Sequence, residues 1–144
     1  MKKIAFFDID GTLTSEIDGS IPVSAIEAIR AARANGNLMF INTGRCFQNV
    51  EERFRSIGFD GLVCGCGTNI YCEDREILHV SQTHDVTMEL LKAAQDADLD
   101  ILFESYKEVT FDRSRPLHDS EAIKLYRQFA SFDYHMPDPN TTPD

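Results

Sequence analysis

The stretch from Ile4 to Thr12 reads Ile-Ala-Phe-Phe-Asp-Ile-Asp-Gly-Thr, an apolar run that ends in two acidic residues and a turn. A hydrophobic run this short, bounded by charged and turn residues, is typical of a buried strand in a parallel sheet. Asp8 and Asp10 then lie at the carboxyl end of that strand, where open α/β sheets bind their ligands. The stretch therefore predicts an α/β fold with a ligand site beside its first strand.

The spacing of Asp8 and Asp10 indicates a metal site. Residues two apart on a strand share a face, so the two carboxylates would lie close together and repel each other. Mg²⁺ relieves such repulsion, because it binds one or two carboxylates and keeps waters that a phosphate can replace. An acidic cluster that merely ends a strand is the alternative, but the buried strand before the pair and Gly11-Thr12 after it favour the metal site.

A second apolar run, residues 38–41, ends in Asn42-Thr43-Gly44-Arg45. Thr43 supplies a hydroxyl group, and Gly44 allows a ligand to approach the backbone closely. Arg45 adds a cation near the start of the next predicted helix, whose N-terminal amides favour an anion. Together with the acidic pair one strand earlier, this segment predicts a phosphate site beside the metal site.

Residues 7–13, Phe-Asp-Ile-Asp-Gly-Thr-Leu, and residues 41–45, Ile-Asn-Thr-Gly-Arg, resemble the first two signature motifs of the haloacid dehalogenase (HAD) superfamily. The resemblance is to its Cof-type sugar-phosphate phosphatase branch and extends through Ile70-Tyr71. Residues 65–70 loosely resemble a third-strand segment of that branch, with Cys66 where Asn is more usual. The resemblance implies a Rossmann-like parallel-sheet core, an α+β cap domain and a Mg²⁺-dependent phosphatase.

The resemblance also implies a role for each site residue. Asp8 would attack the substrate phosphorus and form an aspartyl-phosphate that water hydrolyses. Asp10 would be the general acid and then the general base, which requires a raised pKa. The Asp8 carboxylate and the backbone carbonyl of Asp10 would hold Mg²⁺. Thr43 and the Gly44 amide would hold the transferring phosphoryl oxygens.

Two further family features, a lysine on a later loop and a Gly-Asp-x-x-Asn-Asp motif, have no match in the sequence. The later charged residues, which lie within predicted helices or a polar turn or follow a predicted helix, are interpreted as solvated surface. These residues are Lys92, Lys107, Lys124, Asp96, Asp98 and Asp100. We therefore expect an N-terminal fragment, a truncated product or a proteolysed remnant that carries half of an active site.

The predicted elements fall into two groups. Residues 1–82 form the N-terminal part of an incomplete HAD-like core, with strands at 3–8, 38–42 and 61–64, helices at 23–35 and 46–57, and a hairpin from 70–72 and 77–78. Ser24 is the expected N-cap of the first helix, with Gly36 and Gly58 as helix stops. Residues 83–144 form a partial α+β cap, with helices at 84–96 and 119–132, strands at 101–104 and 109–111, and an irregular tail at 136–144.

By the resemblance, the first strand is flanked on one side by a strand beyond residue 144. Its hydrogen-bonding edge would then be bare in this chain. An exposed apolar edge strand invites pairing with another chain, so self-association or low solubility is expected.

Composition limits the partners. The chain has 24 acidic and 14 basic residues and a net charge of −10, which disfavours nucleic acids and anionic membranes because both need a basic surface. No apolar run approaches the ~20 residues of a membrane span, and Met1-Lys2-Lys3 leads into a strand rather than a signal peptide. We expect a cytoplasmic protein whose substrate is a small phosphorylated metabolite.

The four cysteines, Cys46, Cys64, Cys66 and Cys72, lack the spacing of a zinc site. They are interpreted as reduced thiols, partly buried.

Two other functions stay open. Receiver domains of signalling proteins also place paired acidic residues after the first strand, but they need a phosphoacceptor Asp at the end of the third strand, where this chain has Cys64. The chain is alternatively a non-catalytic remnant that retains only phosphate or Mg²⁺ binding.

Overall fold

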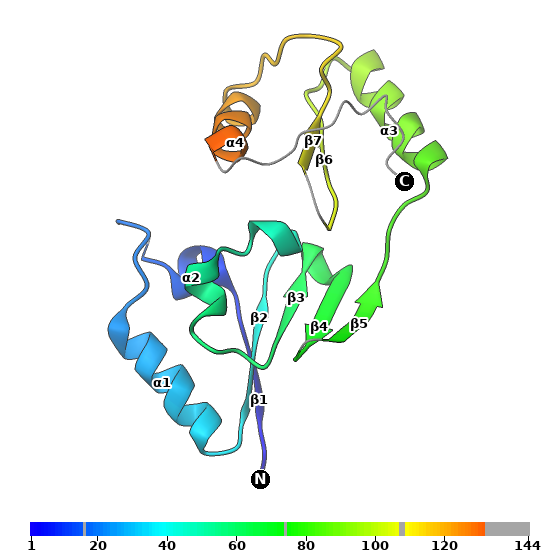
Figure 1. Cartoon of the computed structure of the whole chain (residues 1–144). Helices are drawn as coiled ribbons and strands as arrows, with labels where there is room; N and C mark the ends of the chain where they lie inside the picture. Colours follow the sequence, from blue (N-terminus) through cyan, green and yellow to red (C-terminus); the bar gives the residue numbers. More distant parts are fainter. Residues whose placement is uncertain (16, 74, 107–108, 132–144) are drawn as a thin grey trace. The chain divides into compact units, whose positions relative to one another are not determined.

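The computed structural model of the chain describes residues 1–15, 17–73, 75–106 and 109–131. It divides into two compact units, Met1–Val80 and Ser81–Asp144 (Figure 1). The first unit holds the acidic pair, and the second holds the elements predicted for a cap. The assignment of residues 1–82 to a core and 83–144 to a cap stays a prediction, because compactness alone identifies neither.

The first unit is built on a five-stranded sheet in the order β1-β2-β3-β4-β5. The first three strands are parallel and the last two are antiparallel additions, so the predicted strands and the predicted hairpin are confirmed. The strands are β1 (Ile4–Phe7), β2 (Leu38–Asn42), β3 (Gly61–Cys64), β4 (Asn69–Cys72) and β5 (Arg75–His79).

Helix α1 (Val23–Ala34) connects β1 to β2 and covers one face of the sheet (Figure 1). It ends at Asn35-Gly36 as predicted: Gly36 takes a φ of 80°, which glycine adopts without strain, and its amide donates to the Arg33 carbonyl at 2.8 Å. The prediction of Ser24 as N-cap is wrong. The helix begins at Val23, directly after Pro22, whose ring fixes the φ that precedes the first turn.

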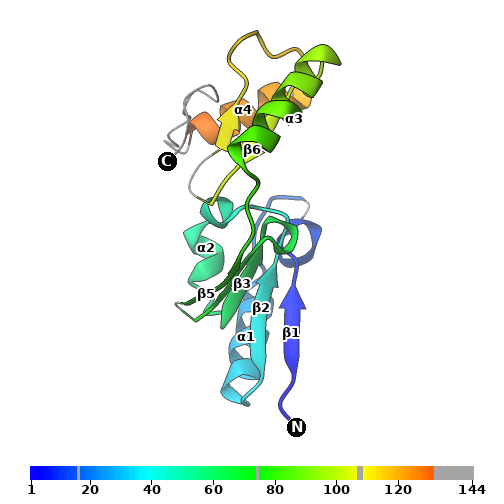
Figure 2. The same cartoon turned by 90° about the vertical axis from the view of Figure 1, so that its right-hand side faces the viewer.

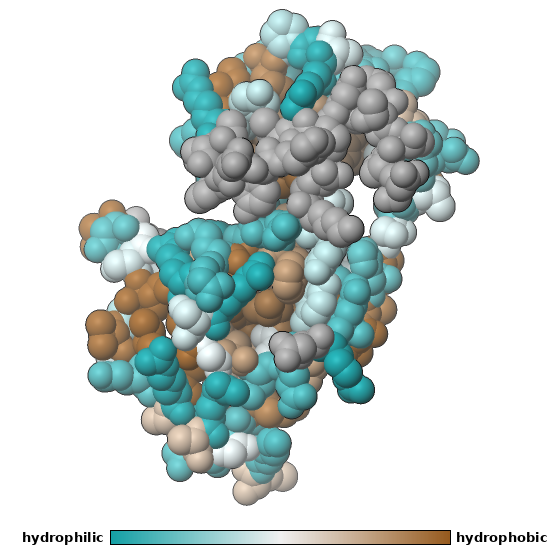
Figure 3. All heavy atoms as spheres, in the orientation of Figure 1, coloured by the Kyte–Doolittle hydropathy of each residue, from teal (hydrophilic) through white to brown (hydrophobic). Residues whose placement is uncertain are grey.

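The core lies between α1 and the sheet. Its buried members come from both of these and from the loops that follow β1 and β2. They are Ile9, Leu13, Ile29, Met39, Ile41, Val50, Phe54, Ile57 and Cys64. Apolar side chains also reach the surface of this unit, between hydrophilic ones, on the face drawn in Figure 3.

The predicted helix over 46–57 is wrong in its extent. A short turn over Phe47–Asn49 is followed by extended residues, and only α2 (Glu52–Arg55) is helical. In this segment, arginine side chains donate hydrogen bonds to backbone carbonyl groups that backbone amides would otherwise bond in a helix. Arg55 donates to the carbonyls of Val50 and Phe47, and Arg45 donates to the Asn49 carbonyl. These contacts satisfy the carbonyl groups without a continuous helix.

The loop before β3 is fixed by Asp60. Its carboxylate accepts two hydrogen bonds from Arg33 of α1, at 2.8 and 3.1 Å, and one from the Met39 amide at 2.8 Å. The Arg33 hydrogen bonds are the main cause that holds the pKa of Asp60 below its ordinary value of 3.8. One carboxylate therefore ties α1, β2 and β3 together.

Asp60→Asn is expected to lower the free energy of unfolding by about 1–2 kcal/mol at neutral pH, because Arg33 loses its anionic partner near the surface. A carboxylate with a lowered pKa in the folded state stabilises it above the ordinary pKa, and this contribution is lost as the pH falls through the lowered value. The difference from wild type should therefore shrink in acid. Urea unfolding at a series of pH values measures it, with Glu27→Gln, an exposed change on α1, as control. An equal difference at all pH values would contradict this account.

The second unit packs two helices with a two-stranded antiparallel sheet. Its elements are α3 (His84–Asp96), β6 (Leu102–Glu104), β7 (Val109–Phe111) and α4 (Ser120–Ser131). Leu91 of α3 is buried, and the buried Phe111 contacts the rings of Tyr126 and Phe129 on α4. The elements predicted for this part are confirmed where the structure describes them; residue 132 and the tail at 136–144 lie outside the described residues.

The interpretation of the charged residues of the second unit as solvated surface is correct for most of them. Lys92 pairs with Asp96 and Lys124 with Glu121, all of them exposed, and the exposed Asp98 pairs with Arg115. Lys107 lies outside the described residues. For Asp100 the interpretation is wrong, because its side chain is only 4% exposed.

The Asp100 side chain is buried because its carboxylate bonds to the segment that leads into α4. It accepts hydrogen bonds from the amides of His118 and Asp119, at 2.8 and 2.7 Å. These amides lie just before the helix, where no helical carbonyl can accept from them.

No helix within the described residues is long and apolar enough to cross a membrane.

Candidate active site

The predicted site residues lie at the carboxyl ends of β1 and β2, which are parallel neighbours with Phe7 beside Ile41. After β1 the chain makes a turn over Ile9–Leu13, and the side chains of Ile9 and Leu13 are both buried in the core. Gly11 takes a φ of 74° inside this turn, a left-handed conformation that favours glycine. Ile9 and Leu13 anchor the two ends of the turn in the core. Residues 10–12 between them, and Asp8 before the turn, are exposed.

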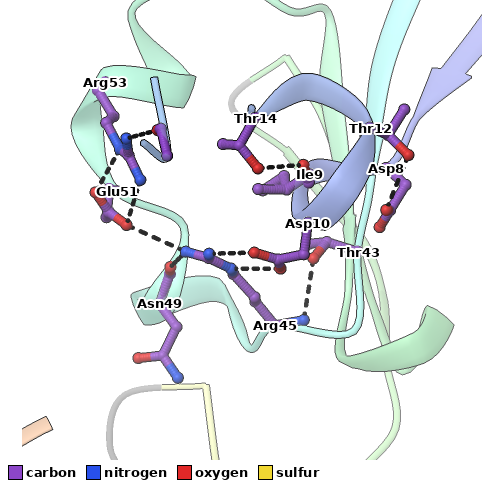
Figure 4. Close-up of polar contacts among 11 residues, drawn as sticks. Asp8, Ile9, Asp10, Thr12, Thr14, Thr43, Arg45, Asn49, Glu51 and Arg53 are labelled. Atoms are coloured by element: carbon purple, nitrogen blue, oxygen red, sulfur yellow. Dashed lines mark hydrogen bonds and ion pairs between the residues drawn. The ribbon is translucent and has the colours of Figure 1, made fainter. Parts of the chain in front are cut away.

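Asp8 follows β1 in extended conformation and is exposed. Its Oδ2 accepts a hydrogen bond from the Thr12 hydroxyl at 3.2 Å (Figure 4). This contact orients the carboxylate with the help of a residue in the same turn. Asp8 therefore presents an accessible carboxylate directly after the first strand.

Asp10 pairs with Arg45, which follows the second strand. Arg45 Nη2 donates to Asp10 Oδ1 at 2.6 Å and Nε donates to Oδ2 at 2.9 Å. The same guanidinium also donates to the Asn49 carbonyl and to Glu51, both at 3.2 Å. A two-point contact of this kind fixes both partners in one plane.

The Arg45 contact makes the expectation of a raised Asp10 pKa wrong for this arrangement. Its hydrogen bonds are the largest cause that holds the pKa of Asp10 below the ordinary value of 3.8, and burial opposes them. Figure 4 shows Asp10 directed toward Arg45 and Asp8 directed toward Thr12. The cation beside Asp10 therefore outweighs the effect of burial on its pKa.

Thr43 and Gly44 lie where β2 ends, beside the turn that carries Asp10. Thr43 is buried, and its amide donates to the Val63 carbonyl at 2.9 Å, which continues the contact with β3. Its hydroxyl oxygen accepts from the Arg45 amide at 3.1 Å. A methyl group added to Gly44 would meet only Cys66 Sγ, at an ordinary contact distance of 3.5 Å. A methyl group at Gly44 would therefore fit without a clash, in contact with the Cys66 thiol.

Arg45 thus joins the two halves of the predicted site, its amide to Thr43 and its side chain to Asp10. The sequence indicated only a cation near a helix start, and α2 begins later, at Glu52. Glu51 was missed altogether. Its carboxylate accepts from Arg45 and from Arg53, a network that crosses a loop and has no periodic signal in the sequence.

Cys66 is a further neighbour that the motif reading did not place in the site. Its amide donates to the Thr43 carbonyl at 3.3 Å, its Sγ lies against Gly44, and its φ of 54° is left-handed. Asn tolerates that conformation better than most residues, which fits the Asn that is more usual there. None of the four cysteines, all of which the structure describes, forms a disulfide, and burial raises the pKa of Cys64 to about 11.

Arg45→Gln is expected to raise the pKa of Asp10 toward its ordinary value, because the largest cause of the lowering is removed. Carboxyl carbon shifts followed by NMR over a pH titration measure this pKa. Arg53→Gln is the matched control, since Arg53 makes the smallest contribution to the Asp10 pKa and should shift it less. An unchanged Asp10 titration in the Arg45 variant would show that the ion pair is not held in solution.

Comparison with known proteins gives relatives about twice as long as this chain. A phosphoglycolate phosphatase from Staphylothermus marinus is 30% identical over 138 residues, which cover 92% of this chain and 53% of the relative. A hypothetical protein from Geobacillus kaustophilus HTA426 has a similar structure, with a TM-score of 0.73 and 25% identity over 96% of this chain and 51% of that one. A sugar phosphatase of HAD subclass IIB gives a TM-score of 0.70 and 26% identity over 91% of this chain and 50% of that one.

The match to the family itself covers almost the whole chain. Residues 5–144 fit the model of haloacid dehalogenase-like hydrolases, which includes both units. The receiver-domain alternative is therefore set aside, and the antiparallel β4 and β5 also differ from an all-parallel receiver sheet. As the two motifs predicted, the chain belongs to the haloacid dehalogenase-like hydrolase family.

Proposed function

We propose that this chain carries the nucleophile side of a Mg²⁺-dependent phosphatase site of the Cof-type branch, which removes phosphate from a small phosphorylated metabolite. Residues 1–82 then belong to the core domain and residues 83–144 to part of the cap. Family membership and relatives named as phosphoglycolate phosphatase and sugar phosphatase support a phosphate ester as substrate. Four cysteines without a disulfide fit the reducing cytoplasm, and the net charge of −10 fits a partner other than nucleic acid or an anionic membrane.

One observation carries the proposal. Arg45 contacts Thr43 through its amide and Asp10 through its guanidinium, so the ends of β1 and β2 meet at a single residue. An exposed carboxylate, Asp8, directly follows the first strand. These contacts support the proposal that a nucleophile, an acid and hydroxyl and amide donors for phosphoryl oxygens lie together at the carboxyl ends of β1 and β2.

In the proposed reaction, an Asp8 oxygen forms a bond to phosphorus while the bond from phosphorus to the leaving oxygen breaks. Asp10 gives its proton to that leaving oxygen. A water then attacks the phosphorus of the aspartyl-phosphate, and Asp10 takes the proton of this water. The bond between Asp8 and phosphorus breaks, inorganic phosphate leaves, and both carboxyl groups return to their starting states.

Asp10 can act as the acid only after Arg45 has released it, since the ion pair keeps the carboxyl ionised. Glu51 offers Arg45 a second carboxylate, which it already contacts at 3.2 Å. An incoming phosphoryl group is a further anion that a guanidinium binds well. We propose that substrate binding shifts Arg45 away from Asp10, which then regains its proton.

The donor set suits Mg²⁺ bound through few protein ligands. Asp8 offers an exposed carboxylate and Asp10 its backbone carbonyl, while the Asp10 carboxylate is held by Arg45. Within the described parts of the chain, no group of three or more His, Cys, Asp or Glu side chains is arranged to hold a metal ion. Mg²⁺ commonly binds through one or two carboxylates, with waters and substrate phosphate as its other ligands. The ion would neutralise charge on the phosphoryl oxygens.

Gly44→Ala is expected to keep the fold but to weaken phosphate binding and hydrolysis by about tenfold or more, because the methyl group fills the space next to the Gly44 amide. Gly44 needs no left-handed φ, and its added Cβ has no clash, so stability should change little. Hydrolysis of an aryl phosphate with Mg²⁺, and binding of inorganic phosphate, measure the effect. Ser24→Ala, an exposed change on α1, is the control. Unchanged binding in the Gly44 variant would contradict the assignment.

The non-catalytic alternative has one observation in its favour, the ionised and tightly paired Asp10. A remnant of this kind would bind Mg²⁺ and inorganic phosphate but would release no product from an aryl phosphate. Retained binding without turnover in the wild-type chain would favour it over the enzyme.

A further inference from the structure

The turn that follows β3, Gly65–Gly67, has an unusual backbone. All three of its residues take positive φ values, 56° at Gly65, 54° at Cys66 and 95° at Gly67. The left-handed region is rare for a residue with a side chain, so Cys66 stays there only because its surroundings hold it. Backbone outliers of this kind are concentrated at functional sites. The turn is therefore a candidate for a role in the neighbouring site.

The turn binds the loop that follows β2 through two backbone hydrogen bonds. The Gly65 amide donates to the Arg45 carbonyl at 2.8 Å, and the Cys66 amide donates to the Thr43 carbonyl at 3.3 Å. The Cys66 Sγ lies 3.5 Å from the position of a Cβ on Gly44. The turn thus holds the residues on both sides of Gly44.

These hydrogen bonds determine the direction of the Gly44 amide. The peptide bond between Thr43 and Gly44 is trans, so the Thr43 C=O and the Gly44 N–H point in opposite directions. The Thr43 carbonyl is directed toward the turn after β3. Because β2 lies between β1 and β3 (Figure 2), the Gly44 N–H is directed toward the side of β1, whose chain continues into Asp8.

The Gly44 amide is also available to a ligand. Gly44 is exposed, and within the described parts of the chain its N–H donates no hydrogen bond. The Thr43 amide, in contrast, donates to the Val63 carbonyl at 2.9 Å. A backbone N–H needs an acceptor, and on this side of the loop an anion can supply it.

We propose that the turn Gly65–Gly67 is a positioning element of the phosphate site, with Cys66 as its positioning residue. It acts through the Thr43 carbonyl, which it binds so that the Gly44 N–H faces the phosphoryl oxygens. A donor that is oriented in advance stabilises charge on these oxygens without reorganisation during the reaction. This role rests on the proposed function, because the phosphate is the one that the proposed reaction transfers.

Cys66→Val tests the role of the backbone conformation. A β-branched residue strongly disfavours a left-handed φ, so the amide at position 66 should no longer reach the Thr43 carbonyl. Binding of inorganic phosphate in the presence of Mg²⁺ should then weaken by about tenfold or more. Calorimetry measures the affinity, and the NMR shift of the Gly44 amide reports contact with phosphate. This shift should change on phosphate addition in the wild type and much less in the variant.

Two other substitutions of Cys66 separate its backbone from its side chain. Cys66→Gly removes the thiol and Cys66→Asn adds bulk, but both new residues tolerate the left-handed region. Both variants should bind phosphate about as tightly as the wild type. Binding weakened as strongly in either of them as in Cys66→Val would assign the effect to the side chain and overturn the proposal.

Glu73→Val is the matched control for backbone strain. Glu73 is exposed and has the same φ of 54° as Cys66, but it lies between β4 and β5. Its neighbour Cys72 pairs with Gly61 at the start of β3, so Glu73 lies at the end of the sheet opposite the site. This variant should lose about as much stability toward urea as Cys66→Val and keep its phosphate affinity. An equal loss of affinity in both variants would show a general effect of strain and overturn the proposal.

Hydrolysis of an aryl phosphate with Mg²⁺ distinguishes failure of this role from failure of the proposed function. Wild-type hydrolysis with no change of the Gly44 shift, or unchanged binding and hydrolysis in Cys66→Val, would overturn the role of the turn and leave the phosphatase standing. A wild type that neither binds phosphate nor hydrolyses the ester would overturn both. In a wild type that binds without hydrolysis, the phosphate titrations of the variants still decide the role of the turn.

Discussion

Asp8→Asn is expected to abolish the Mg²⁺-dependent hydrolysis of an aryl phosphate, with a loss in kcat of about a thousandfold or more. The amide is a poor nucleophile toward phosphorus and a weaker metal ligand, so both proposed roles of Asp8 disappear together. The fold should be retained, because the amide oxygen of Asn can still accept the hydrogen bond from Thr12. Steady-state kinetics with and without Mg²⁺ measure the change.

Asp18→Asn provides the matched control, since Asp18 is an exposed carboxylate of the same unit, whose side chain accepts hydrogen bonds from Ser20. Its hydrolysis rate should remain close to that of the wild type. Hydrolysis that persists in the Asp8 variant, and still depends on Mg²⁺, would show that another group attacks the phosphorus.

Phe54→Ala is expected to lower the free energy of unfolding of the first unit by about 3–5 kcal/mol, because it leaves a cavity in a closely packed core. Phe54 is completely buried, and its ring lies below the guanidinium groups of Arg45 and Arg53, at 5.5 and 4.6 Å from the ring centroid. Its loss should therefore also loosen the arginine that holds Asp10. Urea unfolding measures the stability, and the Asp10 titration measures the second effect.

Phe54→Leu separates these two contributions. Leucine fills much of the space but has no ring face for a cation, so its cost should be smaller, about 1–2 kcal/mol. The Asp10 pKa should nevertheless move in the same direction as in the Ala variant. Equal losses of stability for the two variants would indicate that packing is not the main contribution of Phe54.

The strands could be predicted because each is a short apolar run that ends in polar or turn residues. β1 to β3 and the hairpin of β4 and β5 follow that pattern, and helix α3 begins directly after its N-cap Thr83, whose hydroxyl accepts from the Val86 amide. The position of the acidic pair also follows, since the carboxyl ends of parallel strands share one edge. Local pattern and family motif were sufficient for these features.

The contacts made by arginine side chains could not be predicted. Arg45 reaches Asp10 across 35 positions of the chain, and Arg55 satisfies carbonyl groups in a segment whose pattern favoured a helix. Asp100 looked like surface because it follows a helix among other acidic residues, yet it is buried by its bonds to two amides. Such contacts join residues that are far apart in the sequence and form only in the folded state. The spacing of residues along the chain therefore does not predict them.

Trapping of the covalent intermediate tests the central claim most directly. The chain is mixed with an aryl phosphate and Mg²⁺, quenched in acid within the first turnover, digested, and analysed by peptide mass spectrometry. We predict one phosphoryl group, on Asp8, which is absent from the Asp8→Asn variant. A phosphoryl group on Asp10 or elsewhere, or hydrolysis with no phosphorylated peptide at any time, would contradict the account.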